Sequence, residues 1–187
     1  LRKPVITGPD PVTVADGGNA LFSVTVIDGT PPFTYQWQNN MVDIPGATAS
    51  TYTITGVFLS QNGEVYRCVV TNPAGSETSA GALLTVTAVG PAITSDPVSL
   101  TVTEGGSAQF SVSATGSAPL SFEWLHEDVA IPGAVDPVLD IAPVSSVTHA
   151  GRYRCVVSNT VGSAPSAEAI LTVTPPEILP LPEISMP

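Results

Sequence analysis

The sequence predicts an all-β chain made of two tandem β-sandwiches, each with about seven short strands, and three observations predict this architecture. First, the chain matches itself at an offset of about 87 residues, so that "GGNALFSVTV" from Gly17 corresponds to "GGSAQFSVSA" from Gly105. Second, apolar residues recur at every second position within each copy, which is the period of a β-strand. Third, clusters of Gly, Pro, Asn and Asp separate these runs as turns do.

The predicted strands follow the same order in both copies. Short runs alternate apolar and polar side chains, and no window of the sequence shows the spacing of an amphipathic helix. Each copy is therefore predicted to bury a core of its own. The positions predicted to face inward are Ala20, Phe22, Val24, Val26, Phe33, Tyr35, Trp37, Tyr66, Cys68 and Val70 in the first copy, and Ala108, Phe110, Val112, Ala114, Leu120, Phe122, Trp124, Tyr153, Cys155 and Val157 in the second.

The domain boundaries follow from the repeat. We expect a first domain over residues 1–87, a linker over 88–90, a second domain over 91–174 and an extended, proline-rich tail over 175–187. The linker is short, and the chain ends leave opposite poles of a seven-stranded sandwich. We therefore expect the domains to follow one another end to end as a rod, with some bending at Gly90.

Composition and charge narrow the classes of function. Hydrophobic residues make up 43% of the chain and charged residues only 11%, so we expect Thr and Ser to cover much of the surface. A formal net charge of −11 repels phosphate backbones, and no nucleic-acid partner is expected. Pro interrupts every long apolar stretch, so membrane insertion is not expected either. Because the chain begins at Leu1 rather than Met, we expect a removed leader or a fragment of a longer protein.

Spaced motifs recur in both copies. Trp37 is followed 31 residues later by Cys68 within a Tyr-x-Cys motif, and Trp124 and Cys155 repeat the arrangement. An N-x-x-G motif and an A-x-L-x-V ending then follow in each copy. These motifs resemble the immunoglobulin-like domains of the intermediate set. The resemblance implies that each tryptophan lies on strand C and that the tyrosine two residues before each cysteine forms a tyrosine corner.

The same resemblance makes the cysteine content unusual. The family's second cysteine would stand on strand B, 11 to 14 residues before the tryptophan, where this chain has Val24 and Val112. We expect Cys68 and Cys155 to be free, buried and apolar in character rather than reactive, and not bonded to each other because each faces a separate core. The cysteine-poor repeats with "IPGA" segments are similar to those of bacterial surface and secreted proteins. The predicted structural core residues are Val24, Trp37, Tyr66, Cys68, Val112, Trp124, Tyr153 and Cys155.

No pattern in the sequence predicts catalysis, a cofactor or a metal site. The two histidines, His126 and His149, do not stand in a metal-binding motif, and no G-x-S-x-G element is present. The acidic stretch "EWLHED" from Glu123 is predicted to be a solvated turn, with a calcium site as the alternative. The stretches "GTPPF" from Gly29 and "GSAPL" from Gly116 are predicted to be loops shaped by proline, with a ligand-contacting tip as the alternative.

The tail, "PPEILPLPEISMP", is the segment most suggestive of a contact. Its prolines exclude an interior strand and favour an extended shape. One interpretation is a spacer that leads to a further domain. The other is a segment that docks on a sheet edge or groove of its own chain or of a neighbour. The candidate assembly contacts are Pro176, Ile178, Leu179, Leu181 and Ile184.

These observations together predict a non-enzymatic protein located outside the cell. The first hypothesis is a structural or adhesive building block of a surface fibre, sheath or stalk, which associates with itself or with other surface proteins. The alternatives are a module of a larger secreted protein that binds carbohydrate or protein through loops at one pole, and a decoration domain of a virus particle. Fold class alone does not choose among them.

Overall fold

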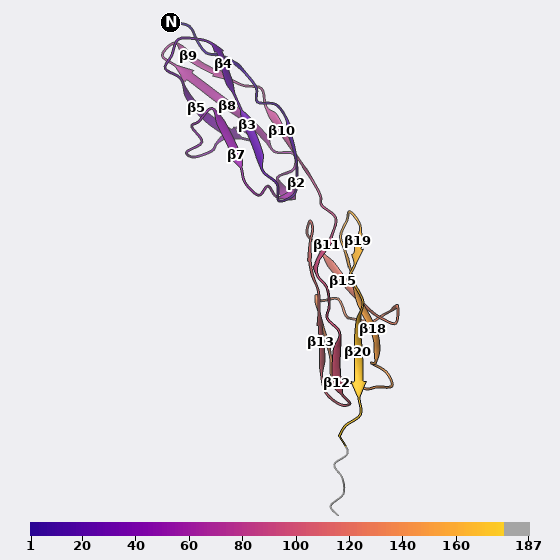
Figure 1. The fold of residues 1–187 in the computed structure, drawn as a ribbon. Coiled ribbons are helices and arrows are strands. Elements are labelled where there is room, and N and C mark those ends of the chain that lie inside the picture. Colours follow the sequence, from indigo (N-terminus) through magenta and orange to yellow (C-terminus); the bar gives the residue numbers. More distant parts are fainter. Residues whose placement is uncertain (178–187) are drawn as a thin grey trace, which may run out of the picture. The chain divides into compact units, whose positions relative to one another are not determined.

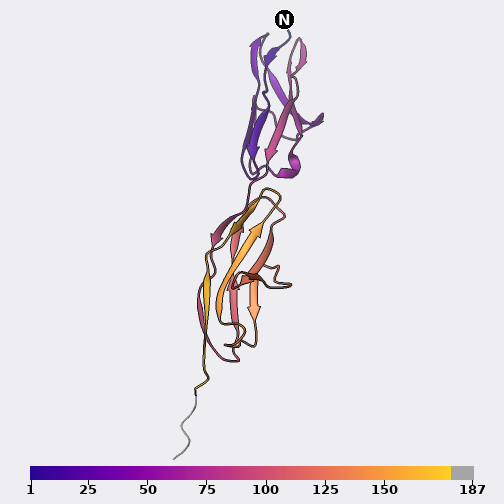
Figure 2. The same cartoon turned by 90° about the vertical axis from the view of Figure 1, so that its right-hand side faces the viewer.

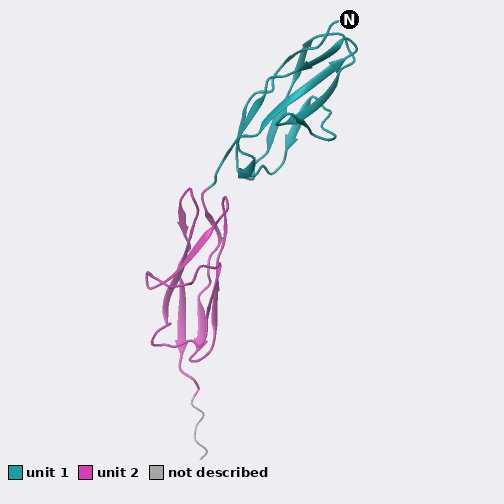
Figure 3. Ribbon diagram, turned by 180° about the vertical axis from the view of Figure 1, so that it is seen from behind, with its two compact units in different colours: residues 1–89 teal, residues 90–187 magenta. Residues whose placement is uncertain are grey.

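The structure, a computed structural model, describes residues 1–177 and divides the chain into two compact units, Leu1–Val89 and Gly90–Pro187 (Figure 3). The predicted all-β fold is confirmed, because the described residues hold a single helical turn, η1 (Leu59–Gln61). In each unit the chain enters at one end and leaves at the opposite end (Figure 2). Each unit is therefore a complete sandwich with its own core.

The first unit has ten strands in two layers (Figure 1). One sheet has the order β2-β10-β8-β5-β6, with β9 also pairing with β8. The other layer consists of the pairs β1-β4 and β3-β7. The strands are β1 (Val5–Thr7), β2 (Val12–Ala15), β3 (Ala20–Ser23), β4 (Thr25–Asp28), β5 (Thr34–Asn39), β6 (Val42–Asp43), β7 (Thr51–Ile54), β8 (Val65–Asn72), β9 (Gly75–Thr78) and β10 (Ala82–Thr87).

The second unit repeats this topology strand for strand. One sheet has the order β12-β20-β18-β15-β16, with β19 also pairing with β18, and the pairs β11-β14 and β13-β17 form the other layer. The strands are β11 (Ala92–Ser95), β12 (Leu100–Thr103), β13 (Ala108–Ser111), β14 (Ser113–Thr115), β15 (Ser121–His126), β16 (Val129–Ala130), β17 (Val138–Ile141), β18 (Gly151–Ser158), β19 (Ser163–Pro165) and β20 (Ala169–Thr174).

The N-terminal segment of the first unit contributes to both sheets. Strand β1 pairs antiparallel with β4, whereas β2 pairs parallel with β10. Gly8 and Pro9 make the crossing between them. Gly8 has a φ of +76°, and a Cβ at this position would lie 2.6 Å from the backbone oxygen of Ser23. Glycine is therefore required there both by the left-handed backbone and by the close approach of the neighbouring strand.

Two separate hydrophobic cores fill the sandwiches. The tryptophans are at the centre of each, and Trp37 and Trp124 have no exposed surface. Burial of each large apolar side chain contributes about 1.5–3 kcal/mol, so cores of this kind dominate the stability of a small sandwich. The buried members are Ala20, Phe22, Val24, Trp37, Val57, Tyr66, Cys68, Val70, Ala82, Leu84 and Val86 in the first unit, and Ala108, Phe110, Val112, Trp124, Leu139, Ile141, Val144, Tyr153, Cys155, Val157, Ala169 and Leu171 in the second.

Candidate functional site

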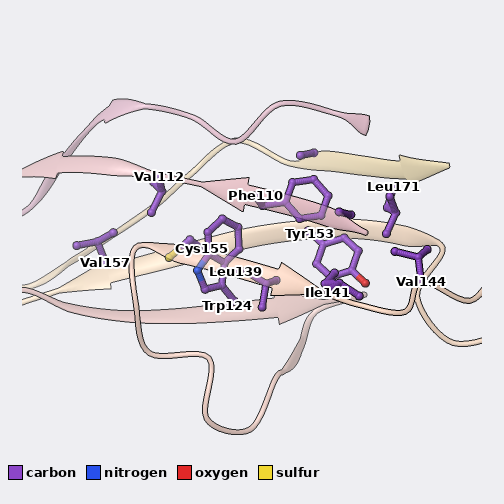
Figure 4. Close-up of a cluster of buried hydrophobic side chains, with 12 residues drawn as sticks. Phe110, Val112, Trp124, Leu139, Ile141, Val144, Tyr153, Cys155, Val157 and Leu171 are labelled. Carbon is purple, nitrogen blue, oxygen red and sulfur yellow. The ribbon is translucent and has the colours of Figure 1, made fainter. Parts of the chain in front are cut away.

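The tryptophan and the cysteine of each unit are direct neighbours. Trp37 on β5 is paired in register with Cys68 on β8, and Trp124 on β15 is paired with Cys155 on β18 (Figure 4). All four side chains are fully buried, and both thiols are free. The two valines at the expected strand-B positions, Val24 and Val112, belong to the same cores and are each 4% exposed.

The environment of the cysteines suppresses their reactivity. Burial raises the pKa of the Cys68 thiol to about 11, and burial also raises the pKa of Cys155. A thiol must ionise to attack an electrophile or to bind a metal, so both remain protonated at neutral pH. Their sulfur atoms therefore act as small apolar groups that pack against the indole rings.

A buried serine holds the backbone of each cysteine. The backbone N–H of Cys68 donates to Oγ of Ser79 at 2.9 Å, while the backbone N–H of Ser79 donates to the Cys68 carbonyl at 2.9 Å. Ser166 makes the same two bonds with Cys155, at 3.0 and 2.8 Å. These serines occur at the break between β9 and β10 and between β19 and β20, where the ladder would otherwise leave donors unpaired.

The "IPGA" segments close the side of each sandwich over the tryptophan. The indole Nε1–H of Trp37 donates to the carbonyl of Ala49 at 2.9 Å, and the backbone N–H of Ile44 donates to the Trp37 carbonyl at 2.9 Å. In the second unit Trp124 Nε1–H donates to the carbonyl of Asp136 at 2.9 Å, and Ile131 donates to Trp124 at 2.8 Å. The recurrent motif is therefore a structural closure for the buried indole.

The tyrosine corner of the second unit uses a backbone acceptor. The hydroxyl of Tyr153 donates to the carbonyl of His149 at 2.8 Å, and Nδ1 of His149 accepts the backbone N–H of Ser145 at 2.9 Å. Burial raises the pKa of Tyr153 to about 12. The imidazole of His126 stacks on the tyrosine ring, with centroids 4.6 Å apart. Both histidines are thus engaged in holding this corner.

The tyrosine corner of the first unit uses a carboxylate instead. The hydroxyl of Tyr66 donates to Oε2 of Glu64 at 2.5 Å, and Nδ2 of Asn39 donates to the same oxygen at 3.1 Å. Burial, reinforced by this bond and by the negative charge of Glu64, raises the pKa of Tyr66. The equivalent of Glu64 is Gly151, where a Cβ would lie 2.5 Å from a carboxylate oxygen of Glu127. Gly151 also has a φ of +137°, so a glutamate here would adopt a backbone conformation that side-chain-bearing residues rarely adopt and would displace the Glu127 carboxylate.

The acidic stretch "EWLHED" ends in a tight turn whose carboxylates are paired with arginine. Glu127 and Asp128 have φ values of +48° and +65° and join β15 to β16. Oε2 of Glu127 lies 3.0 Å from Nη2 of Arg152, and Oδ1 of Asp128 lies 2.9 Å from Nη2 of Arg154. Within residues 1–177 no group of three or more His, Cys, Asp or Glu side chains is placed to hold a metal ion. The carboxylates of this turn are therefore engaged by arginine side chains of the adjacent strand β18.

The loops that contain "GTPPF" and "GSAPL" are braced from within. Nδ2 of Asn72 donates to the carbonyl oxygens of Arg2 and Thr30 at 2.6 and 2.8 Å. In the second unit, Nδ2 of Asn159 donates to the carbonyl of Ser117 at 3.0 Å. The asparagine of each N-x-x-G motif therefore fixes the loop that precedes strand β5 or β15.

One surface cavity of the second unit lies beside its tyrosine corner. It has a volume of about 330 Å³ and is lined by His126, Ile131, Leu139, Pro143, His149 and Tyr153, among others. The structure thus brings together the two histidines, which the sequence left unconnected. A residue-by-residue comparison of the two copies would have shown these differences. His126, His149 and Leu139 have the counterparts Asn39, Asn62 and Tyr52 in the first copy.

The predicted assembly contacts fall almost entirely beyond the described residues. Pro176 is exposed after the end of β20. Ile178, Leu179, Leu181 and Ile184 lie outside the described residues. No helix within residues 1–177 is long and apolar enough to cross a lipid bilayer.

Comparison with known proteins identifies the repeated unit. A family model described as "Immunoglobulin domain" matches residues 90–159. Endoglucanase C of Cellulomonas fimi is 33% identical over 183 residues, which cover 92% of this chain and 16% of that protein. "Cell adhesion molecule-related/down-regulated by oncogenes" of Xenopus laevis is 31% identical, covering 89% of this chain and 16% of that protein. The chain therefore spans about a sixth of the length of these relatives.

Solved structures show the same fold in tandem. Immunoglobulin domains 1–5 of sidekick-1 superimpose with a TM-score of 0.53 at 23% identity, covering 92% of this chain and 40% of that one. The titin domains Z1Z2, solved in complex with telethonin, give a TM-score of 0.52 at 23% identity, covering 93% and 98%. The insect immune protein hemolin gives 0.58 at 20% identity, covering 91% and 47%.

Proposed function

This chain is a tandem pair of immunoglobulin-like domains, and we propose that it is a non-enzymatic structural or adhesive segment of an extracellular protein. In this proposal the two domains form a spacer or building block of a surface fibre, sheath or stalk. They associate with further copies or with other surface proteins, and the tail after Thr174 contributes by docking on a neighbour.

The observation that carries the proposal is that the reactive and ionisable side chains are engaged in contacts within the fold. The two thiols are buried and protonated, the two imidazoles hold a tyrosine corner, and the acidic turn is paired with arginine. Catalytic sites instead keep such groups poised at a cleft with perturbed acid–base properties that serve the reaction. In this chain the thiols, imidazoles and acidic side chains stabilise the fold instead. Such a chain is suited to bearing mechanical load or to offering its surface to other proteins.

The relatives support the same direction. One curated relative is named as a cell adhesion molecule-related protein, and the hemolin structure is described in terms of homophilic adhesion. Within this chain, each unit receives the polypeptide at one end and releases it at the other (Figure 2). Such a topology lets successive domains extend a chain, which suits a spacer.

The proposal is tested by measuring self-association of the purified chain. We expect sedimentation velocity over a wide concentration range to show assemblies of residues 1–187, and electron microscopy to show that they are elongated. We expect a chain that ends at residue 174 to associate more weakly, while its circular dichroism and unfolding midpoint stay unchanged. A matched control keeps the composition of residues 175–187 in shuffled order. Monomers at every concentration, without binding to a surface partner, would refute the proposal.

A second candidate function is that of an accessory module that binds glycan within a larger secreted enzyme. The specific observation in its favour is the 33% identity with a segment of endoglucanase C. Carbohydrate sites commonly present exposed aromatic rings, yet only Phe58 is exposed among the aromatic side chains of residues 1–177. Retention of the monomeric chain on insoluble glucans would favour this candidate over the first.

A further inference from the structure

Strand β7 of the first unit has one edge without a partner. It pairs only with β3, and no other strand among residues 1–177 adjoins it. The backbone N–H of Val24 donates to the carbonyl of Ser50 at 3.0 Å, in continuation of the β3–β7 register. Hydrogen-bonded and non-hydrogen-bonded pairs alternate along an antiparallel ladder, so the N–H and C=O groups of Thr51 and Thr53 point away from β3. These groups form a free edge that can accept an added strand.

A hollow lies beside this free edge. It has a volume of about 330 Å³ and is lined by β7 and by the segment from Ile44 to Ala49 that precedes it. Ile44 and Tyr52, both in the lining, are partly buried and pack against the core of the unit. The hollow therefore offers apolar contacts to the side chains of an added strand.

The equivalent edge of the second unit is protected. Strand β17 pairs only with β13, and it carries Asp140 at the position of Thr53. Pro137 and Pro143 flank the strand. Charged side chains and prolines are common means of blocking an exposed sheet edge. By contrast, residues 46–61, which include β7, contain no charged residue and no proline. The first unit therefore has the open edge of the two.

The other edge strands of the first unit are less suitable. Strand β6 has only two residues, and β1 has three residues with an irregular register. Strand β2 lies between Pro11 and Asp16. Strand β7 is therefore the edge that best accepts a partner.

The sequence of the tail has the proline spacing of an edge strand. An extended chain directs the backbone groups of successive residues to opposite sides, and proline supplies no N–H. Pro180 and Pro182 are two residues apart, so in an extended chain both lack a donor on the same side. Leu179, Leu181 and Glu183 then place an unbroken row of N–H groups on the other side. Proline is tolerated in an edge strand where its nitrogen faces solvent.

We propose that residues 177–185 of one copy pair, as an added strand, with the free edge of β7 in a neighbouring copy. Leu179 and Leu181 exchange backbone hydrogen bonds with β7, whereas Pro180 and Pro182 face away from it. The inference rests on the proposed function, in which the tail docks on a neighbour, and it names the strand that receives the tail.

Apolar contact and charge favour the same receiver. The tail has isoleucine or proline at positions 178, 180, 182 and 184 and leucine at 179 and 181, so an apolar face meets the hollow in either strand direction. The tail is acidic, with Glu177 and Glu183. Residues 1–89 hold six acidic and three basic side chains, whereas residues 90–174 hold eight and two. The first unit therefore repels the tail less than the second unit does.

A single proline on either side of the tail tests the pairing. Leu181→Pro interrupts the row of donors, whereas Ile184→Pro, the matched control, adds a proline on the side of Pro180 and Pro182. Each variant replaces one large aliphatic side chain by proline, so they differ in the side that loses its N–H. In sedimentation velocity of the full chain, we expect Leu181→Pro to weaken self-association about tenfold and Ile184→Pro at most about threefold.

Two aspartate substitutions test the receiving strand. Thr53→Asp introduces the residue that protects β17, and Thr13→Asp, the matched control, puts the same charge on an exposed threonine of β2, at an edge of the other sheet. A chain that ends at residue 174 serves as the receptor, and a fluorescent peptide of residues 175–187 serves as the probe. In fluorescence anisotropy, we expect the Thr53→Asp receptor to bind the peptide about tenfold more weakly than the wild type and the Thr13→Asp receptor to bind it equally well. Circular dichroism checks that both variants are folded.

The possible results separate this contact from the proposed function. If the full chain associates but does so equally well without residues 175–187, the contact is wrong and self-association uses another surface. Equal weakening by Leu181→Pro and Ile184→Pro overturns the strand pairing, and equal peptide binding by both aspartate variants excludes β7 as the receiver. If the peptide binds while the full chain stays monomeric at every concentration, docking on a neighbour is wrong. A monomeric chain that also fails to bind the peptide overturns both the contact and self-association.

Discussion

The two units have equivalent cores but differ at the start of the strand that carries the cysteine. In the second unit, Arg152 on β18 lies 3.0 Å from Glu127, 3.4 Å from Glu168 and 3.8 Å from Asp128. In the first unit the equivalent of Arg152 is Val65, and its neighbours are uncharged: Asn40, Met41 and Gly81 stand where the second unit has its three acids.

The replacement is coordinated across several strands. A Cβ added to Gly81 would lie 2.5 Å from Cγ1 of Val65, so the glycine makes room for the valine. Val65 pairs in register with Leu83, which is 45% exposed, and Met41 on the adjacent turn is 73% exposed. A duplicated sandwich can therefore exchange a charged surface network for an apolar surface while its buried tryptophan, tyrosine and cysteine remain the same. The fold depends on the core, and the outer surface is free to diverge.

The largest expected effect tests the shared core. Trp37→Ala and Trp124→Ala should each lower the free energy of unfolding of the domain that carries it by about 3–5 kcal/mol, because each removes a fully buried ring and its hydrogen bond. Chemical denaturation followed by circular dichroism measures the loss. Leu21→Ala, at a position that is 57% exposed, is the control and should be close to neutral. A loss below about 1 kcal/mol for either tryptophan would contradict the equivalence of the two cores.

An intermediate effect tests why the two tyrosine corners differ. Gly151 has a φ of +137°, and an added Cβ would meet Glu127 and His126. Gly151→Ala should therefore cost about 1–3 kcal/mol in unfolding free energy. Gly162→Ala is the matched control, since its φ is not left-handed and a Cβ there would contact nothing within 4 Å. Thermal unfolding of both variants makes the comparison, and equal midpoints would show that the glycine is not required.

The smallest effect tests the charged network itself. Arg152→Val, which installs the counterpart Val65, should lower the unfolding midpoint slightly at low salt and not at high salt, because exposed ion pairs are screened. The backbone N–H of Arg152, which the variant keeps, lowers the pKa of Glu127 in the folded state, and the side-chain hydrogen bonds and charge of Arg152, which the variant loses, lower this pKa further. The stabilisation is thus present above the pKa of the unfolded carboxyl, about 4.3, and is lost as the pH falls through the lower folded value. A difference between wild type and variant that persists unchanged in acid and in high salt would exclude an electrostatic origin.

Much of the fold could be predicted from the sequence because its signals are local and repeated. The alternation around Trp37 and the Tyr-x-Cys motif at Cys68 depend only on the strand period and on spacing along the chain. The split of the alternating run at Val24, where the chain changes partner from β7 to β1, was not predictable in this way. It depends on which strand lies alongside, and that information is not local.

The features of the candidate site were harder to predict for the same reason. In the sequence, Ser79 looks like an ordinary loop serine. Its role in accepting the backbone N–H of Cys68 is evident only once the break in the neighbouring strand is known. The cavity next to Leu139 is lined by residues of β15, β17 and β18 and of the segments between them. The two copies differ in sequence at several of these positions. What each difference does depends on contacts between residues that are far apart in the sequence.

The free thiols beneath the tryptophans have one more consequence. Because neither sandwich is held by a covalent bridge between its sheets, reductants such as dithiothreitol have no bond to break, and folding requires no oxidising enzyme or compartment. The polypeptide can thus acquire its final shape on either side of a membrane. Each sheet must also slide past the other against noncovalent packing alone when the domain is pulled apart.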